Sequence, residues 1–179
     1  MDGISSMTYL ELGYGNGRNF ESILCAEKQA VDVNGLADFN GTTDDFFEWI
    51  PGNQKWDIIF IDADHDYPSV LLDFNNSMCH ATGWVVLHDM IPPDKKHTSR
   101  NFCSDSFKLL YRLMREVGRG VYSSDHNMGL TFVNVKLCGN IYLDDLPLEL
   151  SYENFVIFMK TIRLYSDPEL VEILNGRMT

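Results

Sequence analysis

The chain has 179 residues, of which 45% are hydrophobic and 12% aromatic, as in one ordinary folded domain with a sizeable core. Its formal net charge of −12 opposes binding to polyphosphates, so we expect no nucleic-acid partner. No apolar stretch is long enough to span a membrane, and the first residues lack the basic and apolar regions of a signal peptide. The four cysteines are scattered without a CxxC pair, which predicts reduced thiols in a cytoplasmic protein.

Apolar runs of strand length alternate with helical patterns along the chain, which predicts a mostly parallel sheet with helices on its faces. The strands, ending in an antiparallel pair, are expected at Met7–Leu12, Gln29–Val33, Trp56–Ala63, Gly83–His88, Gly120–Ser123 and Gly129–Lys136. The helices are expected at Gly17–Ala26, Asp45–Ile50, Tyr67–His80 and Ser104–Val117, with two more after Ser151, the second capped near Asp167.

Three glycines stand at every second position between the first strand and the first helix, in the stretch YLELGYGNGRNF. Without side chains at Gly13, Gly15 and Gly17, a ligand could approach the backbone amides at the start of the helix. The spacing GxGxG differs from the GxGxxG of dinucleotide-binding domains, so it suits a ligand without a pyrophosphate. Alone, the pattern fits a purely structural turn equally well.

Two further stretches could extend such a site. Asp32 ends the second strand, where a carboxylate can bind both hydroxyls of a ribose or simply cap a turn. Thr43 and Asp44 follow in GTTDDFF, where they could face the edge of an adenine ring or form the N-cap pair of the helix Asp45–Ile50.

Polar side chains gather at the carboxyl ends of the strands predicted at Trp56–Ala63 and Gly83–His88. Asp62, Asp64 and His65 stand at the end of the first of these strands, and His88 and Asp89 at the end of the second, so they meet if the two strands are neighbours. Such a set could bind Mg, Mn or Zn, which would hold a vicinal diol and lower its pKa. Alternatively, His88 or His65 acts as a general base oriented by Asp89 or Asp62, or these side chains only cap the ends of strands and helices.

Several of these stretches occur in the order seen in class I S-adenosylmethionine-dependent methyltransferases: LELGYGNG, VDVN, TTDDFFEWI, WDIIFIDADHDYPSVLLDF and GWVVLHDMIPP. The chain resembles that family over roughly Tyr9–Val135, and most resembles its small-molecule O-methyltransferases with FIDGxHxY and HD after the fourth and fifth strands. The resemblance implies an α/β fold: a Rossmann-like, doubly wound, mostly parallel seven-stranded sheet with one antiparallel edge strand. Residues 1–136 would form the methyltransferase domain, and residues 137–179 a C-terminal helical appendage packed on it.

The resemblance also implies the cofactor, the acceptor and the residues of the site. The cofactor would be S-adenosylmethionine, and the reaction O-methylation of a small hydroxylated molecule such as a sugar. The implied cofactor-binding residues are Glu11, Gly13, Tyr14, Gly15, Gly17, Asp32, Thr43, Asp44 and Asp62. The implied catalytic residues are His88 and His65, and the implied metal ligands are Asp62, His88 and Asp89. Relatives with a metal carry an acid or amide where this chain has His88, so the metal site departs from theirs.

A second departure is the connection between the second and third strands. Only VNGLADFN joins Asp32 to Gly41, which is too short for the helix that the family has there. The adenine pocket would then be open on one side or completed by another subunit of a homo-oligomer, and the C-terminal helices or that partner would form the lid. Two other functions stay open: a non-catalytic assembly module of the same fold and, disfavoured by the glycine spacing, a dinucleotide-dependent oxidoreductase.

Overall fold

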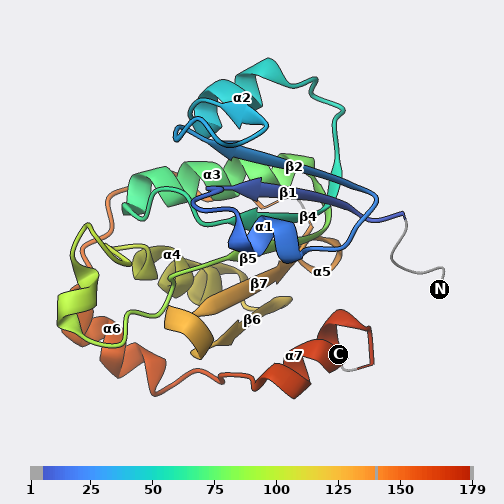
Figure 1. Cartoon of the computed structure of the whole chain (residues 1–179). Helices are drawn as coiled ribbons and strands as arrows, with labels where there is room; N and C mark the ends of the chain where they lie inside the picture. Colours follow the sequence, from blue (N-terminus) through green and yellow to red (C-terminus); the bar gives the residue numbers. More distant parts are fainter. Residues whose placement is uncertain (1–5, 140, 178–179) are drawn as a thin grey trace.

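A computed structural model describes residues 6–139 and 141–177. Residues 1–5 of the predicted domain 1–136, and residues 140 and 178–179 of the predicted appendage 137–179, lie outside the described residues. Seven strands form one sheet in the order β3-β2-β1-β4-β5-β7-β6 (Figure 1). The strands are β1 Thr8–Leu12, β2 Glu27–Asp32, β3 Phe39–Asn40, β4 Trp56–Ile61, β5 Ala81–Leu87, β6 Val121–Ser124 and β7 Leu130–Asn134. Only β7 runs antiparallel to its neighbours, β5 and β6, so the prediction of a mostly parallel seven-stranded sheet is confirmed.

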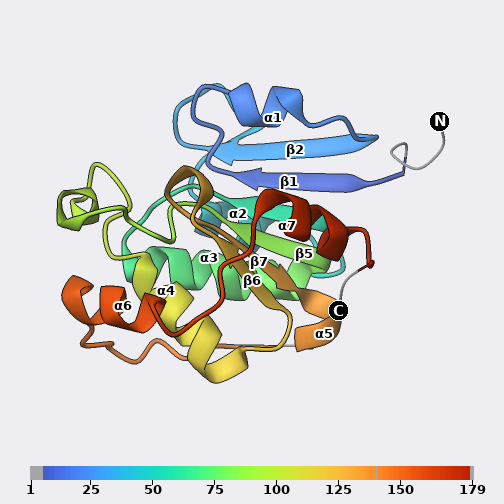
Figure 2. The ribbon, with the colours of Figure 1, turned by 90° about the horizontal axis from the view of Figure 1, so that it is seen from below.

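Helices cover both faces of the sheet (Figures 1 and 2). The α-helices are α1 Arg18–Ser22, α2 Thr43–Trp49, α3 Tyr67–His80, α4 Phe107–Arg112, α5 Val135–Cys138, α6 Tyr152–Met159 and α7 Asp167–Leu174. Three short helices of other types join them: η1 Lys95–Thr98, the π-helical η2 Leu113–Val117 and η3 His126–Met128. None of the helices in the described residues is long and apolar enough to cross a membrane. All four cysteines are free thiols, as predicted.

The two faces of the sheet bury cores of different size. On one face, α2, α3, α4 and α6 contribute to one large core, in which α6 packs on α4, and the side chains of Phe46, Phe74 and Phe155 are almost completely buried there. On the other face, Phe20 of α1 packs with Tyr9 and other residues of the first strands in a smaller cluster. Because helices cover both faces, the parallel strands read as nearly continuous apolar runs, which is why the sequence identified them.

The structure corrects several predicted boundaries. β3, which is only two residues long, was not predicted as a strand. No helix lies between β2 and β3, in agreement with the short connection after Asp32. The predicted cap of the second helix was wrong, because Thr42 is the N-cap and forms a capping box with Asp45. The predicted strand to Lys136 was also wrong, because the side chain of Asn134 accepts hydrogen bonds from two following amides and starts α5.

Three other helices differ from their predicted boundaries in smaller ways. α1 is five residues long and stops at Ser22, before an extended Ile23, so it is shorter than the predicted Gly17–Ala26. The predicted helix Ser104–Val117 is divided into α4 and the π-helical η2. The N-cap of α7 is Ser166, which forms a capping box with Glu169, and not Asp167 as predicted.

The chain after α5 returns across α3 without regular structure. The side chain of Asn75 in α3 binds both backbone groups of Leu143, at 3.0 Å to the amide and 2.8 Å to the carbonyl. The buried guanidinium of Arg112 donates to the Tyr67 hydroxyl and to the Asp144 carboxylate. Since Asn75 and Tyr67 both belong to α3, this helix anchors the returning segment directly at Leu143 and, through Arg112, at Asp144.

Candidate functional site

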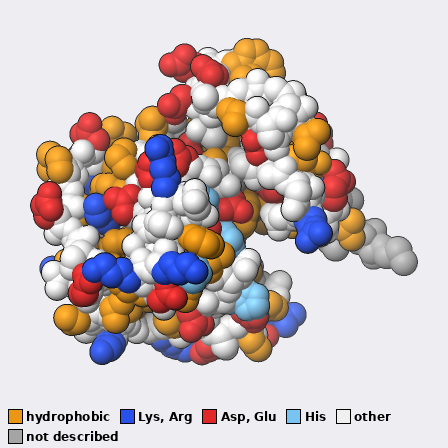
Figure 3. All heavy atoms as spheres, turned by 60° about the vertical axis from the view of Figure 1, so that its left-hand side comes forward, with side chains coloured by type: hydrophobic (Ala, Val, Ile, Leu, Met, Phe, Trp, Pro, Cys, Tyr) orange, Lys and Arg blue, Asp and Glu red, His pale blue; other side chains and the backbone are white. Residues whose placement is uncertain are grey.

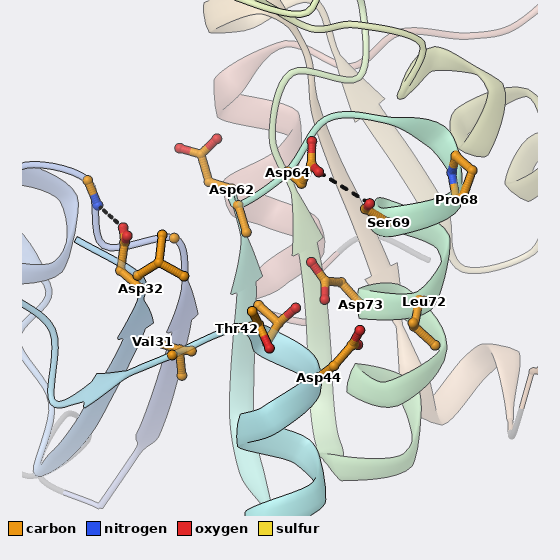
Figure 4. A pocket seen from close by; sticks show the side chains of 16 residues that line it. Val31, Asp32, Thr42, Asp44, Asp62, Asp64, Pro68, Ser69, Leu72 and Asp73 are labelled. Carbon is orange, nitrogen blue, oxygen red and sulfur yellow. Dashed lines mark hydrogen bonds between the residues drawn. The ribbon is translucent and has the colours of Figure 1, made fainter. Parts of the chain in front are cut away.

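A pocket of about 750 Å³ opens at the carboxyl ends of β1, β2 and β4 (Figure 4). Its walls come from the turn after β1, the end of β2, the start of α2, the end of β4 and one side of α3. This volume is in the range of pockets that hold small molecules and cofactors. The lining residues are Gly13, Gly15, Val31, Asp32, Val33, Gly41, Thr42, Thr43, Asp44, Asp62, Ala63, Asp64, Pro68, Ser69, Leu72 and Asp73.

The glycines of the turn after β1 have different physical roles. A Cβ on Gly13 would overlap the carbonyl group of Asp62, so this glycine is needed for the contact between two segments of the protein. A Cβ on Gly15 would meet no atom within 4 Å, and Gly15 has a φ of +55° and lines the pocket. Gly15 is therefore the glycine that leaves space beside the backbone for a ligand, although its amide donates to Asp32 and its carbonyl accepts from Asn34, whereas the sequence had suggested this role for all three.

Asp32 fixes the turn from the other side. One carboxylate oxygen accepts a hydrogen bond from the Gly15 amide at 2.8 Å (Figure 4). The other accepts from the Asn34 amide at 2.9 Å. The side chain is half-buried and lines the pocket. Each oxygen keeps a lone pair for a further donor, so Asp32 can hold the turn and a ligand hydroxyl at the same time.

Three of the predicted cofactor residues do not line the pocket. Glu11 is 1% exposed, and its carboxylate accepts hydrogen bonds from the Tyr9 hydroxyl at 2.5 Å and the Asn19 amide at 2.7 Å. Burial raises the pKa of Glu11. The ring of Tyr14 packs edge-on against Phe20, and Gly17 lies beneath the Tyr14 hydroxyl. These residues support the turn from behind, and the structure does not bring them to the pocket.

The opposite wall of the pocket contains an acid that the sequence analysis missed. Asp73 of α3 is only 2% exposed and points into the pocket, between Asp44 of α2 and Asp64 of the turn before α3 (Figure 4). Burial raises the pKa of the Asp73 carboxyl to about 7. The signal for it was present, because Asp73 stands three residues after the buried Val70 and one before the buried Phe74 on an otherwise apolar side.

Four side chains form an alternating cluster beside the pocket. The Nδ1 atom of His88 lies 3.1 Å from Asp62 Oδ1 and 3.2 Å from Asp89 Oδ1. His65 lies on the other side, with Nδ1 3.2 Å from Asp89 Oδ2 and Nε2 3.7 Å from Asp62 Oδ1. The structure thus brings together the residues predicted after the two neighbouring strands β4 and β5. Only Asp62 belongs to both the cluster and the pocket lining.

The backbone and the turn before β7 hold this cluster in place. Asp89 has a φ of +59°, which is strained for a residue with a side chain, and its buried Oδ1 atom accepts no hydrogen bond from the part of the chain that the structure describes. Asn127 of η3 also has a positive φ, and its Nδ2 atom lies 2.9 Å from His88 Nε2. The sequence analysis missed Asn127, because it lies 39 residues after His88 in the chain and no local pattern links the two.

Charge raises the pKa of both imidazoles in the cluster. Burial lowers the pKa of His65, but hydrogen bonding to Asp89 and the charges of Asp89 and Asp62 outweigh it. Burial also lowers the pKa of His88, and the hydrogen bond and charge of Asp62 outweigh it. Each imidazole therefore holds a proton more firmly than a free histidine does.

The lining of the pocket is acidic. The carboxyl ends of the parallel strands lie on the left of Figure 1, and Figure 3 brings that side forward. In that view the surface is hollowed, with acidic and histidine side chains in and beside the hollow and some lysine and arginine side chains near it. Among the described residues, the pocket lining includes aspartates and no lysine, arginine or histidine. The field in the pocket therefore favours a cationic or neutral ligand over an anionic one.

Comparisons with known proteins agree on the fold. No family model matches the chain, and no curated protein is similar to it. Among solved structures, it is similar to the MycE methyltransferase from the mycinamycin biosynthetic pathway, in complex with Mg, SAH and mycinamycin VI. The TM-score is 0.51 at 17% identity, over 72% of this chain and 45% of MycE, so the chain spans less than half of that protein.

A second solved structure is similar over most of its length. The O-methyltransferase from Bacillus cereus in complex with SAH has a TM-score of 0.52 at 14% identity, and the match covers 72% of this chain and 74% of that protein. At these identities the likeness establishes a shared Rossmann-like fold and nothing about activity.

Proposed function

We propose that this protein is an S-adenosylmethionine-dependent methyltransferase that transfers a methyl group to a hydroxyl oxygen of a small acceptor such as a sugar. The observation that carries the proposal is the position of the pocket, with the open Gly15 and the carboxylate of Asp32, directly beside the His–Asp cluster. The fold supports it, because two methyltransferases of the same fold were solved with SAH, the demethylated form of this cofactor.

The residues of the pocket fit the cofactor chemically. The free space beside Gly15 would accept the amino-acid part, Asp32 would accept hydrogen bonds from the ribose hydroxyls, and Thr43 and Asp44 would lie toward the adenine. The bound cofactor supplies an electrophilic methyl carbon on a positively charged sulfur. The aspartates of the lining complement that positive charge.

The cluster also fits a divalent ion. Asp62, His88 and Asp89 offer ligand atoms that lie within 4.8 Å of one another. The buried Oδ1 of Asp89 faces His88 but accepts no hydrogen bond from the described residues, and a cation could satisfy such an atom. A bound ion there would hold the acceptor hydroxyl and lower its pKa. The ligand set of two carboxylates and one imidazole suits Mg, Mn or Zn.

The side chains of the cluster can also act on the proton of the acceptor. His88 lies against two carboxylates at Nδ1 and the Asn127 amide at Nε2, and His65 lies against Asp89 at Nδ1, so both rings are oriented. In its neutral form, an imidazole oriented in this way can take the proton of a hydroxyl group that lies behind the methyl carbon. In this proposal Asp62 links the two parts of the site, because it lines the pocket and contacts both imidazoles.

A binding titration tests the cofactor. Calorimetry with SAH should give a dissociation constant in the micromolar range, with NAD as the negative control that excludes an oxidoreductase. The absence of heat with both SAH and S-adenosylmethionine would contradict the proposal.

A second experiment tests the reaction. A panel of sugars, phenols and other hydroxylated metabolites should yield a methylated product, and comparison with and without added Mg would show whether a metal is needed. Binding of SAH without methylation of any acceptor would favour the alternative, a non-catalytic assembly module of the same fold.

A further inference from the structure

The position of Asp73 is unusual for an acid. Asp73 is only 2% exposed, yet its side chain lines the pocket and points into it from α3 (Figure 4). A buried charge without a cationic partner is costly, so such an acid either takes up a proton or contacts a ligand.

Most of the groups around Asp73 disfavour its charged form. Burial is the main cause of its raised pKa, and repulsion from Asp44 of α2 and Asp64 of the turn before α3 adds to it, whereas hydrogen bonding to the Thr43 side chain lowers the pKa. Asp62 and Asp32 face it across the pocket, and no lysine, arginine or histidine lines the pocket in the described parts of the chain. The carboxyl of Asp73 is therefore protonated in a substantial share of the molecules near neutral pH.

A protonated carboxyl has the hydrogen-bonding pattern that is complementary to adenine. It offers one O–H donor and one carbonyl acceptor side by side. The edge of adenine offers the N1 acceptor and the N6 amino donor at a similar separation. An ionised carboxylate can satisfy only the amino group and would repel the lone pair of N1.

We propose that the protonated carboxyl of Asp73 recognises the adenine ring of the cofactor, donating a hydrogen bond to N1 and accepting one from the N6 amino group. Thr43 and Asp44 lie next to it and complete the same wall of the pocket. This inference rests on the proposed function and adds two properties to it. One residue recognises the adenine ring by hydrogen bonds, and the affinity for the cofactor falls as the pH rises.

The pH dependence of SAH binding tests this inference. Because the bound form requires the proton, the dissociation constant should increase about tenfold between pH 6 and pH 8 at fixed ionic strength. At pH 8 the wild-type protein should take up a proton on binding, which calorimetry in two buffers of different ionisation enthalpy measures directly.

Asp73→Asn is the decisive variant, because an amide presents the same donor and acceptor at every pH. It should bind SAH at pH 8 as well as the wild type does at pH 6, without the uptake of a proton. Asp73→Leu should bind weakly at every pH. Asp145→Asn, an exposed control that removes the same charge far along the chain, should keep the wild-type pH dependence.

The imidazoles of the cluster also titrate, and their contribution is the same in the wild type and in Asp73→Asn, so the difference between the two isolates Asp73. An affinity that is constant or rises with pH in the wild type would overturn the inference, and so would loss of binding in Asp73→Asn with an unchanged melting temperature. Both outcomes leave the proposed methyltransferase function intact. Failure of the wild type to bind SAH at any pH would overturn both.

Discussion

The two parts of the site are held together in different ways. The pocket is shaped mainly by backbone: a turn that depends on glycine, the short end of β2 and the sides of two helices. The cluster is shaped by side chains that hold one another, with Asn127 contributed from a distant turn. Cofactor binding and the chemical step therefore depend on different sets of contacts that meet at Asp62. Single substitutions should then change the affinity for the cofactor without changing turnover, or the reverse.

The largest expected effect is in the cluster. His88→Ala should lower kcat by about 10²–10⁴-fold, the usual range for loss of a proton-transfer group. SAH affinity should change little, because His88 does not line the pocket. Calorimetry and a methylation assay on the same preparation measure the two quantities, and His65→Ala shows which imidazole matters more. Parallel loss of binding and turnover in His88→Ala would refute the separation.

The next effect is in the pocket. Asp32→Ala should weaken SAH binding by about 100-fold, because it removes charge-assisted hydrogen bonds to the ligand and to the Gly15 amide. Asp38→Ala is a matched control, since the Asp38 carboxylate also holds a backbone amide of β2, that of Ala30, but lies outside the pocket lining. Equal losses in the two variants would mean that the effect comes from damage to β2.

Two glycine variants test whether Gly13 and Gly15 have different roles in the turn after β1. Gly13→Ala should cost about 2–4 kcal/mol in the free energy of unfolding, because its methyl group would overlap the carbonyl of Asp62. Gly15→Ala should cost only about 1 kcal/mol of backbone strain, but its methyl group would occupy the pocket and weaken SAH binding. Urea unfolding and calorimetry distinguish the two, and identical behaviour would contradict the assigned roles.

The smallest expected effect concerns stability without ligand. The pKa of Asp73 is raised from 3.8 to about 7, so its protonated form stabilises the fold at low pH and that contribution is lost as the pH rises toward 7. Asp73→Asn should therefore be more stable than the wild type by about 1–2 kcal/mol at pH 8, less than the full pKa difference because the amide must also be buried. Urea unfolding at pH 5 and pH 8 checks this, and a larger gain at pH 5 would contradict it.

The sequence predicted most of the sheet, because its buried strands are continuous apolar runs and α3 has clear boundaries. It did not predict β3, since two residues carry no periodicity. It also placed the helix cap at Thr43 and Asp44 instead of Thr42, because several capping residues stand in a row and only the backbone geometry selects among them.

The candidate site was predictable where the ends of neighbouring strands bring residues together. Asp62, His88 and Asp89 follow adjacent parallel strands, and they meet for that reason. Asn127 depends on the path of a distant turn, which no local pattern specifies. The division of roles between Gly13 and Gly15 depends on what each Cβ would touch, and that is a property of the folded chain.

Helix α3 connects the pocket with a part of the molecule that contacts no ligand. Leu72 and Asp73 form one wall of the pocket, and two residues later Asn75 holds the backbone of Leu143. A ligand that stabilises this helix from the pocket side should also stabilise the irregular segment after α5 that crosses it. Binding of SAH in the pocket should then slow the cleavage of residues 144–150 by an added protease.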